Sequence, residues 1–351
     1  LNAPSRKVIG TWVGKLEFID ASEGSGRVIL STLDGDVECD MSKVETATLQ
    51  KVETLKSSLD TASDPSFELA TAWQVHLQPR DWTAEEKKQV LSDAMERWIK
   101  GVMEVTATRV SAWDAVNESV SGRDTNGDGF YELESAAWGS SSNFYWQDYL
   151  GSEDYVRIVI ANARKYYAEY GGTAPLKLFI NDYNLESDWD DNKKIKSLIH
   201  WINIWESDGV TKVDGIGTQM HVSYYENEAT QKSKENHYVK MLQLMANTGK
   251  LVKISELDMG YVDKNGNTVG TANITDAQLR KMADYYDFIV TKYFEIVPPA
   301  QQYGITQWCL TDAPGALGTG WRGGEPVGLF YENYKRKYAY AGFANGLMRS
   351  W

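Results

Sequence analysis

Two glutamates that follow apolar, β-rich runs are the side chains best suited to chemistry in this sequence. Glu118 ends the run Trp-Asp-Ala-Val-Asn-Glu, and Glu256 follows Lys253-Ile254-Ser255. A carboxyl pair on two facing strands can act as general acid and nucleophile when its surroundings keep one group protonated and the other ionised. Cleavage of a glycosidic bond uses such a pair. A single glutamate at a strand end is more often a solvated charge, but two after such apolar strands favour a catalytic pair.

Further polar side chains end the neighbouring apolar runs. In a parallel α/β barrel the active site lies at the carboxyl ends of the strands, so polar residues at those ends should gather on one rim. Four runs in this sequence end in such a cluster. We therefore expect one polar rim. Besides the two glutamates, its members are Asn117, Asn181, Tyr183, Gln219, His221 and Asp258.

The elements that must position these residues follow from the alternation of short apolar runs with longer amphipathic stretches. From residue 67 onward this alternation predicts repeated strand-and-helix units with a parallel sheet. Capping boxes at Thr83–Glu86 and Thr275–Gln278 predict the starts of two helices. The six predicted strands are Phe67–Val75, Arg109–Val116, Leu176–Ile180, Gly215–His221, Leu251–Leu257 and Gly304–Leu310.

The predicted fold class is α/β, a (β/α)8 TIM barrel with atypical N-terminal strands. Because six units are too few to close such a barrel, residues 1–66 would have to supply two more. They predict instead a hairpin of Lys7–Ile19 and Arg27–Leu33, followed by a helix at Ser42–Leu59. The segment is either two shortened barrel units or the remnant of an inserted β-module. We place the domain boundary between this segment, 1–66, and a barrel domain, 67–351.

Composition excludes several classes of function. The chain has 351 residues and a formal net charge of −13, so a nucleic-acid partner, which needs a cationic face, is not expected. It has no apolar run long enough for a membrane span, and its first residues lack the apolar core of a signal peptide. The 13 Trp and 20 Tyr residues provide flat apolar faces that suit sugar rings.

Several strand-end motifs resemble those of one enzyme family. The runs Trp113–Glu118, Gly215–His221, Ser255–Asp258 and Ile305–Trp308 look, in order and spacing, like motifs of glycoside hydrolase family 10 xylanases. So do Trp321–Gly324 and Leu329–Tyr334. The resemblance covers about residues 67–351. It implies a (β/α)8 hydrolase that cleaves internal β-1,4 bonds of xylan with retention of configuration and without a cofactor.

The resemblance also implies a partner and a location. The partner would be xylan or xylo-oligosaccharides. The protein would be secreted, periplasmic or on the cell surface, and we expect a monomer.

The resemblance assigns a role to each matching position. Glu118 would be the acid/base and Glu256 the nucleophile that forms the covalent glycosyl intermediate. Asn117 would hydrogen-bond the 2-hydroxyl of the sugar at the cleavage site. The remaining matches would support the nucleophile or bind substrate: His221, Gln219 and Asp258 around Glu256, and Trp308 and Trp321 as aromatic walls. Asn181 and Tyr183 of the polar rim, which the resemblance does not assign, are further candidates for substrate binding or support.

The N-terminal part of the resemblance is less complete. His76-Leu77-Gln78 with Trp82 is similar to the family's third-strand motif, in which the histidine and tryptophan line the cleavage site. The family's second strand ends in a Glu-Asn pair with a Lys soon after, and no such run precedes His76. The missing run leaves open a non-catalytic xylan-binding barrel. A β-1,4-glucanase on the same fold is a further alternative, because the sequence does not show the shape of the pocket around the sugar's C5 substituent.

A loop with acidic residues at alternate positions imitates a calcium site. Asp124, Asn126 and Asp128 are spaced like the first ligands of an EF-hand loop, but its twelfth position is Ser135 rather than glutamate. We therefore predict a polar surface loop here and no metal site.

Overall fold

The computed structural model describes residues 12–19, 27–32, 35–40, 83–138, 143–312 and 321–349 of the chain. The chain divides into two units between Val90 and Leu91, and each is described by itself. Two predicted elements, the helix at 42–59 and the strand at 67–75, lie outside the described residues, as do the candidate site residues His76 and Trp82.

The N-terminal unit contains a three-stranded antiparallel meander, β1 (Trp12–Ile19), β2 (Arg27–Thr32) and β3 (Gly35–Asp40). The pairing of β1 with β2 confirms the described part of the predicted hairpin. The third strand was not predicted, although the run Asp-Val-Glu-Cys-Asp alternates polar and apolar residues with the period of a strand. The described strands of this segment pair antiparallel, whereas the strands of a (β/α)8 barrel run parallel.

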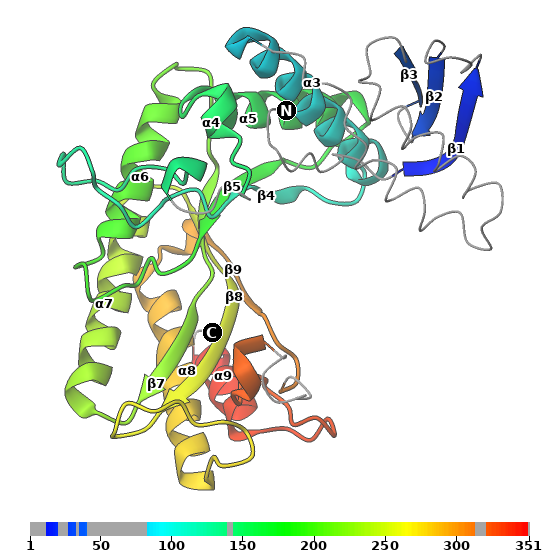
Figure 1. The fold of residues 1–351 in the computed structure, drawn as a ribbon. Coiled ribbons are helices and arrows are strands. Elements are labelled where there is room, and N and C mark those ends of the chain that lie inside the picture. Colours follow the sequence, from blue (N-terminus) through cyan, green and yellow to red (C-terminus); the bar gives the residue numbers. More distant parts are fainter. Residues whose placement is uncertain are drawn as a thin grey trace. The chain divides into compact units, whose positions relative to one another are not determined.

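The larger unit is built on a parallel sheet flanked by helices (Figure 1). The strand order is β4-β5-β6-β8-β7, and β9 pairs with β8 as well; every ladder in this sheet is parallel. Its strands are β4 (Ala112–Asn117), β5 (Lys177–Asp182), β6 (Gly215–Thr218), β7 (His221–Tyr225), β8 (Leu251–Val262) and β9 (Gln302–Gln307).

Helices alternate with these strands along the chain, as the sequence predicts. The first of them, α3, continues from the N-terminal unit into the larger one. The helices are α3 (Ala84–Thr106), α4 (Gln147–Leu150), α5 (Asp154–Glu169), α6 (Lys193–Glu206), α7 (Glu228–Asn247), α8 (Asp276–Ile296) and α9 (Tyr338–Arg349), with short 3-10 turns η3 (Ala136–Trp138), η4 (Pro299–Gln301) and η5 (Trp321–Gly324).

Two strands differ from the predicted runs. The run Gly215–His221 forms two strands, β6 and β7, because Met220 between them takes a left-handed φ of 59°. β8 has 12 residues and extends past the predicted end at Leu257. Its first part pairs with β6, and its second part pairs with β7, with His221 opposite Asp258. The kink thus brings the histidine beside the long strand.

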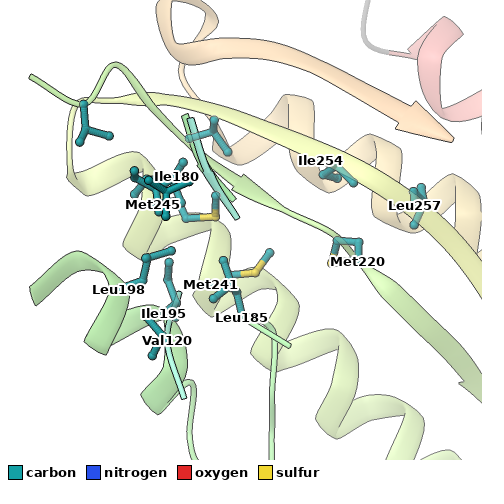
Figure 2. Close-up of a cluster of buried hydrophobic side chains, with 14 of the residues drawn as sticks. Val120, Ile180, Leu185, Ile195, Leu198, Met220, Met241, Met245, Ile254 and Leu257 are labelled. Carbon is teal, nitrogen blue, oxygen red and sulfur yellow. The ribbon is translucent and has the colours of Figure 1, made fainter. Parts of the chain in front are cut away.

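An apolar core between the sheet and the helices holds the strands in place. β5 carries five consecutive buried residues, as a strand covered on both faces should. Figure 2 shows Ile180 of this strand with Met241 and Met245 of α7 and Ile195 and Leu198 of α6. All five side chains are fully buried.

Both predicted capping boxes are present. The hydroxyl of Thr275 accepts the backbone N–H of Gln278, and the Gln278 side chain accepts the N–H of Thr275 at 2.9 Å. Thr83 and Glu86 make the same reciprocal pair. The start of each helix could therefore be predicted from local sequence alone.

Candidate active site

Glu118 stands immediately beyond β4 in a conformation that is rare for a residue with a side chain. Its φ is 54°, in the left-handed region. Its N–H donates to the carbonyl of Asn181 at 2.8 Å, and the N–H of Val120 donates to Oδ2 of Asp182 at 3.0 Å. Contacts from β5 thus fix the backbone on both sides of the glutamate. Such strain is kept where the surroundings over-determine the conformation, and it is common at functional sites.

A chain of amide side chains links the two predicted catalytic carboxyls. Nε2 of Gln219 donates to Oε1 of Glu118 at 2.8 Å and lies 3.5 Å from Oδ1 of Asn117. Nδ2 of Asn181 donates to that same Oδ1 at 2.8 Å and to Oε1 of Glu256 at 3.2 Å. The structure therefore brings Glu118, Asn117, Asn181, Gln219 and Glu256 together in one network.

Ser255 sets the orientation of the central amide, Asn181, and was not among the residues predicted for the site. Its hydroxyl donates to Oδ1 of Asn181 at 2.6 Å. Because that oxygen is occupied, the amide nitrogen of Asn181 is turned towards Glu256 and Asn117. Gly217 opposite leaves the necessary room, since a Cβ there would overlap the same oxygen. The signal was present in the sequence, because Ser255 directly precedes Glu256.

His221 lies between Glu256 and Asp258. Its Nε2 is 3.2 Å from Oε2 of Glu256, and its Nδ1 is 3.3 Å from Oδ2 of Asp258, an ion-pair distance. Burial acts to lower the pKa of His221, but the hydrogen bond and charge of Asp258 and the charge of Glu256 outweigh it, so the pKa is raised above its ordinary value. The imidazolium form is thereby favoured beside the predicted nucleophile.

Two indole rings flank this histidine. The ring centroid of His221 is 5.8 Å from that of Trp308 and 5.0 Å from that of Trp321, and the two indoles are 6.1 Å apart. Both tryptophans remain exposed, at 50% and 43%, in a protein where most large apolar side chains are buried. Exposed indole faces beside a carboxylate suit the C–H face of a sugar ring.

Asp258 is fully buried and accepts hydrogen bonds from Trp321 and Arg322. Trp321 was predicted only as an aromatic wall, and no role was predicted for Arg322. Nε1 of Trp321 donates to Oδ2 of Asp258 at 2.5 Å, and Nη1 of Arg322 donates to its Oδ1 at 2.9 Å. Arg322 also pairs with Glu325, through Nη2 to Oε2 at 3.1 Å. The motif Trp321–Gly324 could be found in the sequence, but the role of its arginine depends on the contact with Asp258, which is distant in the chain.

Tyr183, the other predicted rim residue, lies beside a buried ion pair rather than in the amide chain. Nζ of Lys194 is 2.8 Å from Oδ1 of Asp182 and 3.3 Å from the centroid of the Tyr183 ring. Burial raises the pKa of Asp182, and Lys194 opposes that shift. This pair supports the carboxylate that holds the backbone after Glu118.

In the acidic loop after β4, carboxylate oxygens accept hydrogen bonds from backbone N–H groups of the same loop. Oδ1 of Asp124 accepts the N–H of Gly127 at 2.9 Å, and Oδ1 of Asp128 accepts the N–H of Phe130 at 2.8 Å. Nζ of Lys193 lies 2.5 Å from Oδ2 of Asp124. Within the described ranges, no cluster of three or more His, Cys, Asp or Glu side chains could hold a metal ion. These contacts hold the loop to its own backbone and to α6.

A cavity of about 680 Å³ is lined by β4, α3, α5 and residues 144–147. Asn117 and Glu118 line it, but its walls are mainly apolar, and Glu256, Trp308 and Trp321 are not among its lining residues. It therefore does not contain both carboxyls. The hydrogen-bonded network, with its two indoles, locates the candidate active site.

The arrangement defines a class of protein. Two carboxyls are joined through amides: Glu118 lies just beyond β4, and Glu256 lies within β8 beside a histidine and two indoles. Two carboxyls brought together on a parallel α/β fold are the arrangement typical of glycoside hydrolases that use a carboxyl pair.

The comparisons with known proteins agree with that class. The chain belongs to glycosyl hydrolase family 10, whose family model matches residues 70–346. Endo-1,4-beta-xylanase A of Cellvibrio japonicus is 28% identical over 292 residues, which are 79% of this chain and 43% of that protein. Endo-1,4-beta-xylanase A of Halalkalibacterium halodurans is 29% identical over 232 residues, 65% of this chain and 50% of that protein. The chain thus spans about half the length of these relatives.

Solved structures of similar fold are also xylanases. Native xylanase 10C from Cellvibrio japonicus superposes with a TM-score of 0.60 at 22% identity, over 82% of this chain and 60% of that one. Xylanase 10B from Thermotoga petrophila, solved in complex with xylobiose, has a TM-score of 0.54 at 27% identity, over 77% and 68%. The family and these neighbours confirm the predicted (β/α)8 class.

Proposed function

We propose that this protein is an endo-β-1,4-xylanase that hydrolyses internal bonds of xylan by double displacement with retention of configuration. The observation that carries the proposal is the chain of amides from Glu118 to Glu256, which holds two carboxyls from different strands in one network. Membership of family 10 and the names of the relatives support xylan as the substrate.

In the first step, Glu256 attacks the anomeric carbon while Glu118 donates its proton to the departing glycosidic oxygen. The C–O bond to the leaving sugar breaks, and a covalent glycosyl–Glu256 ester forms. The imidazolium of His221 lies beside the attacking carboxylate and orients it. Asn117 is placed by Asn181 and Gln219 to bind the sugar 2-hydroxyl.

In the second step, the ionised Glu118 takes a proton from water, and the water oxygen attacks the anomeric carbon. The ester to Glu256 breaks, and both carboxyls return to their starting state. Trp308 and Trp321 supply apolar walls on which the sugar at the cleavage point packs. Every group is a side chain of this chain, and no cofactor takes part in the proposed reaction.

The partner and location extend the same proposal. Xylobiose and xylotriose occur in the solved structures of relatives, and we infer that this protein binds xylo-oligosaccharides and acts outside the cytoplasm as a monomer. None of the helices in the described part of the chain has the length and apolar character needed to span a bilayer.

The test compares wild type with Glu256→Ala on xylan, with reducing sugar as the readout. We expect the variant to lose at least about a thousandfold in kcat with an unchanged circular dichroism spectrum. Glu169→Ala, which removes an exposed carboxyl at the end of α5, is the matched control and should retain wild-type activity.

The same assays separate the alternatives. Binding of xylan without release of reducing sugar would favour the non-catalytic barrel, and faster release from β-1,4-glucan than from xylan would favour the glucanase. NMR of the first products should show the β anomer, because two displacements restore the starting configuration. Initial formation of the α anomer would contradict the double displacement.

A further inference from the structure

The guanidinium of Arg322 joins three segments that are far apart in the sequence. Nη1 donates to the carbonyl of Val222 at 2.7 Å and to Asp258 at 2.9 Å. Nη2 donates to the hydroxyl of Ser223 at 2.7 Å and to Glu325 at 3.1 Å. A single side chain thus connects β7, β8 and the segment that carries Trp321. Arginine suits this place because its planar fork makes several bonds in fixed directions.

The guanidinium of Arg322 lies over Gly260, in a space that we call the notch and that a side chain at position 260 would fill. Gly260 is two residues beyond Asp258 on β8 and pairs with Ser223 of β7. Side chains two apart on a strand share a face, so a side chain at position 260 would stand beside the Asp258 carboxylate. A Cβ built there would overlap Oε2 of Glu325 and Nη2 of Arg322. The absence of a side chain at this one position lets the Arg322–Glu325 pair reach Asp258.

The backbone at Arg322 is held in an unusual conformation. Arg322 has a φ of 51°, and Gly323 has a φ of 63°. A left-handed conformation is costly for arginine, and it persists where the surrounding contacts require it. The five bonds of the guanidinium and the indole bond of Trp321 to Asp258 are those contacts.

We propose that Arg322, seated in the notch over Gly260, is a positioning residue for the nucleophile of the proposed reaction. It fixes Asp258, which in turn holds both His221 and the indole of Trp321. His221 then sets the orientation of Glu256. The inference rests on the proposed function, because it concerns the reactivity of Glu256 towards a sugar.

The arginine's charge has a second consequence. Asp258 is fully buried with His221, Trp321 and Arg322 as its neighbours, so the cation compensates the anion there. Other titratable groups around this cluster are Glu256 on β8, Glu325 on the segment of Trp321, and the buried Glu186, which interacts with His221. Without the guanidinium, the charge of Asp258 would be balanced by His221 alone, and the imidazole would move towards Asp258. The contact between His221 and Glu256 would then be broken.

The experiment measures the attack of Glu256 directly. A dinitrophenyl 2-deoxy-2-fluoro-β-xylobioside reacts with the nucleophile of a retaining enzyme: a bond forms between the carboxylate and the anomeric carbon, and dinitrophenolate leaves with the bonding electrons. The fluorine slows hydrolysis of the ester, so the labelled protein accumulates. Its rate is read from dinitrophenolate absorbance and from intact mass. The leaving group needs no proton, so the rate does not depend on Glu118.

Arg322→Met and Gly260→Ala are the two test variants. The first removes the guanidinium, and the second leaves Arg322 in the sequence but fills its notch with one methyl group. We expect Arg322→Met to lower the labelling rate by at least about tenfold and Gly260→Ala to lower it by about three- to tenfold. Arg322→Lys, which keeps the charge but not the fork, should fall between wild type and Arg322→Met.

Two controls separate positioning from general loss of stability. Gly101→Ala adds a methyl group to an exposed glycine of α3 with no atom nearby, and it should label at the wild-type rate. Thr275→Ala removes the helix cap of α8 and should lower the melting temperature without changing the labelling rate well below it. If Arg322→Met does not fold, Gly260→Ala and Arg322→Lys carry the test.

The outcomes are distinct. Slower labelling of the test variants at retained fold supports the proposal. Labelling of Gly260→Ala and the folded Arg322 variants at the wild-type rate overturns it while leaving the proposed function intact. No labelling of the wild-type protein overturns both.

Discussion

At the scale of single residues, the site depends on which way a few amide and imidazole groups are turned. Asn181 presents its nitrogen to Glu256 and its oxygen to Ser255, so a hydroxyl outside the substrate's reach determines what the nucleophile contacts. His221 has a carboxylate on each ring nitrogen. Both cases show that a group one step from the reacting atoms fixes the chemistry available to them.

Replacing Ser255 tests the amide orientation. Ser255→Ala removes the donor to Oδ1 of Asn181, and we expect kcat/KM on xylo-oligosaccharides to fall by about tenfold, the equivalent of one hydrogen bond. Ser255→Thr keeps the hydroxyl and is the matched control, with activity close to wild type. Equal activity of the alanine and wild-type proteins would show that the orientation of Asn181 has another cause.

The raised pKa of His221 predicts how stability depends on pH. A group whose pKa is higher in the folded protein than its ordinary 6.5 binds more protons when folded, so its stabilisation is complete below that value and is lost as the pH rises through the folded value. The free energy of unfolding of wild type should therefore exceed that of His221→Asn most at about pH 5.5 and progressively less towards about pH 9. Urea denaturation across this range measures it. A difference that grows with pH would refute the sign.

At the scale of elements, close approach of helices depends on small residues. α8 and α9 pack against each other along the C-terminal part of the chain, as Figure 1 shows. Gly342 of α9 lies against the backbone of Ala283 on α8, and Gly346 lies against Val290. Glycine is otherwise a poor helix former, so its presence at these two positions follows from packing rather than from helix propensity.

Gly342→Ala tests this contact. A Cβ at this position would overlap the backbone carbonyl of Ala283, so we expect the substitution to cost about 1–3 kcal/mol of the free energy of unfolding. Gly101→Ala in the exposed face of α3 is the matched control and should gain about 1 kcal/mol from helix propensity. Thermal melting of the two variants should therefore move in opposite directions. Stabilisation by both would show that α9 can shift away at no cost.

At the scale of the whole molecule, a buried ion pair ties the C-terminal segment to the end of the sheet. Nζ of Lys337 donates to Oδ1 of Asp312 at 2.6 Å and to the carbonyl of Pro326 at 2.8 Å, and both charged side chains are almost completely buried. The N–H of Gly328 donates to the same carboxylate oxygen. In an acidic chain with net charge −13, an anion placed here without its cation would be doubly unfavourable.

Lys337→Met should therefore be strongly destabilising. It leaves Asp312 buried without a cation, and we expect a loss of about 3–5 kcal/mol in the free energy of unfolding. Lys292→Met, which breaks the exposed pair with Glu295, is the matched control and should cost less than about 1 kcal/mol. Chemical denaturation measures both. Similar losses in the two variants would show that burial of the Lys337 pair adds nothing.

Local patterns in the sequence were enough to predict the strands, the helix starts and the two candidate carboxyls of this protein. Apolar runs gave the strands of the parallel sheet, and Thr275 with Gln278 gave a helix start, because burial and capping act on neighbouring residues. Glu118 could be chosen because it follows such a strand, and Glu256 because it comes directly after the apolar first part of β8. Their gathering on one rim follows from the rule that parallel strands end on the same side.

The tertiary structure alone decided which side chains support these carboxyls. Arg322 carries no local signal for its role, since it contacts Asp258 and Val222, which are 64 and 100 residues away along the chain. The kink at Met220, which places His221 beside Asp258, likewise depends on pairing between β7 and β8. Contacts between distant segments depend on how the strands are paired and kinked, and the period of a local pattern contains no information about them.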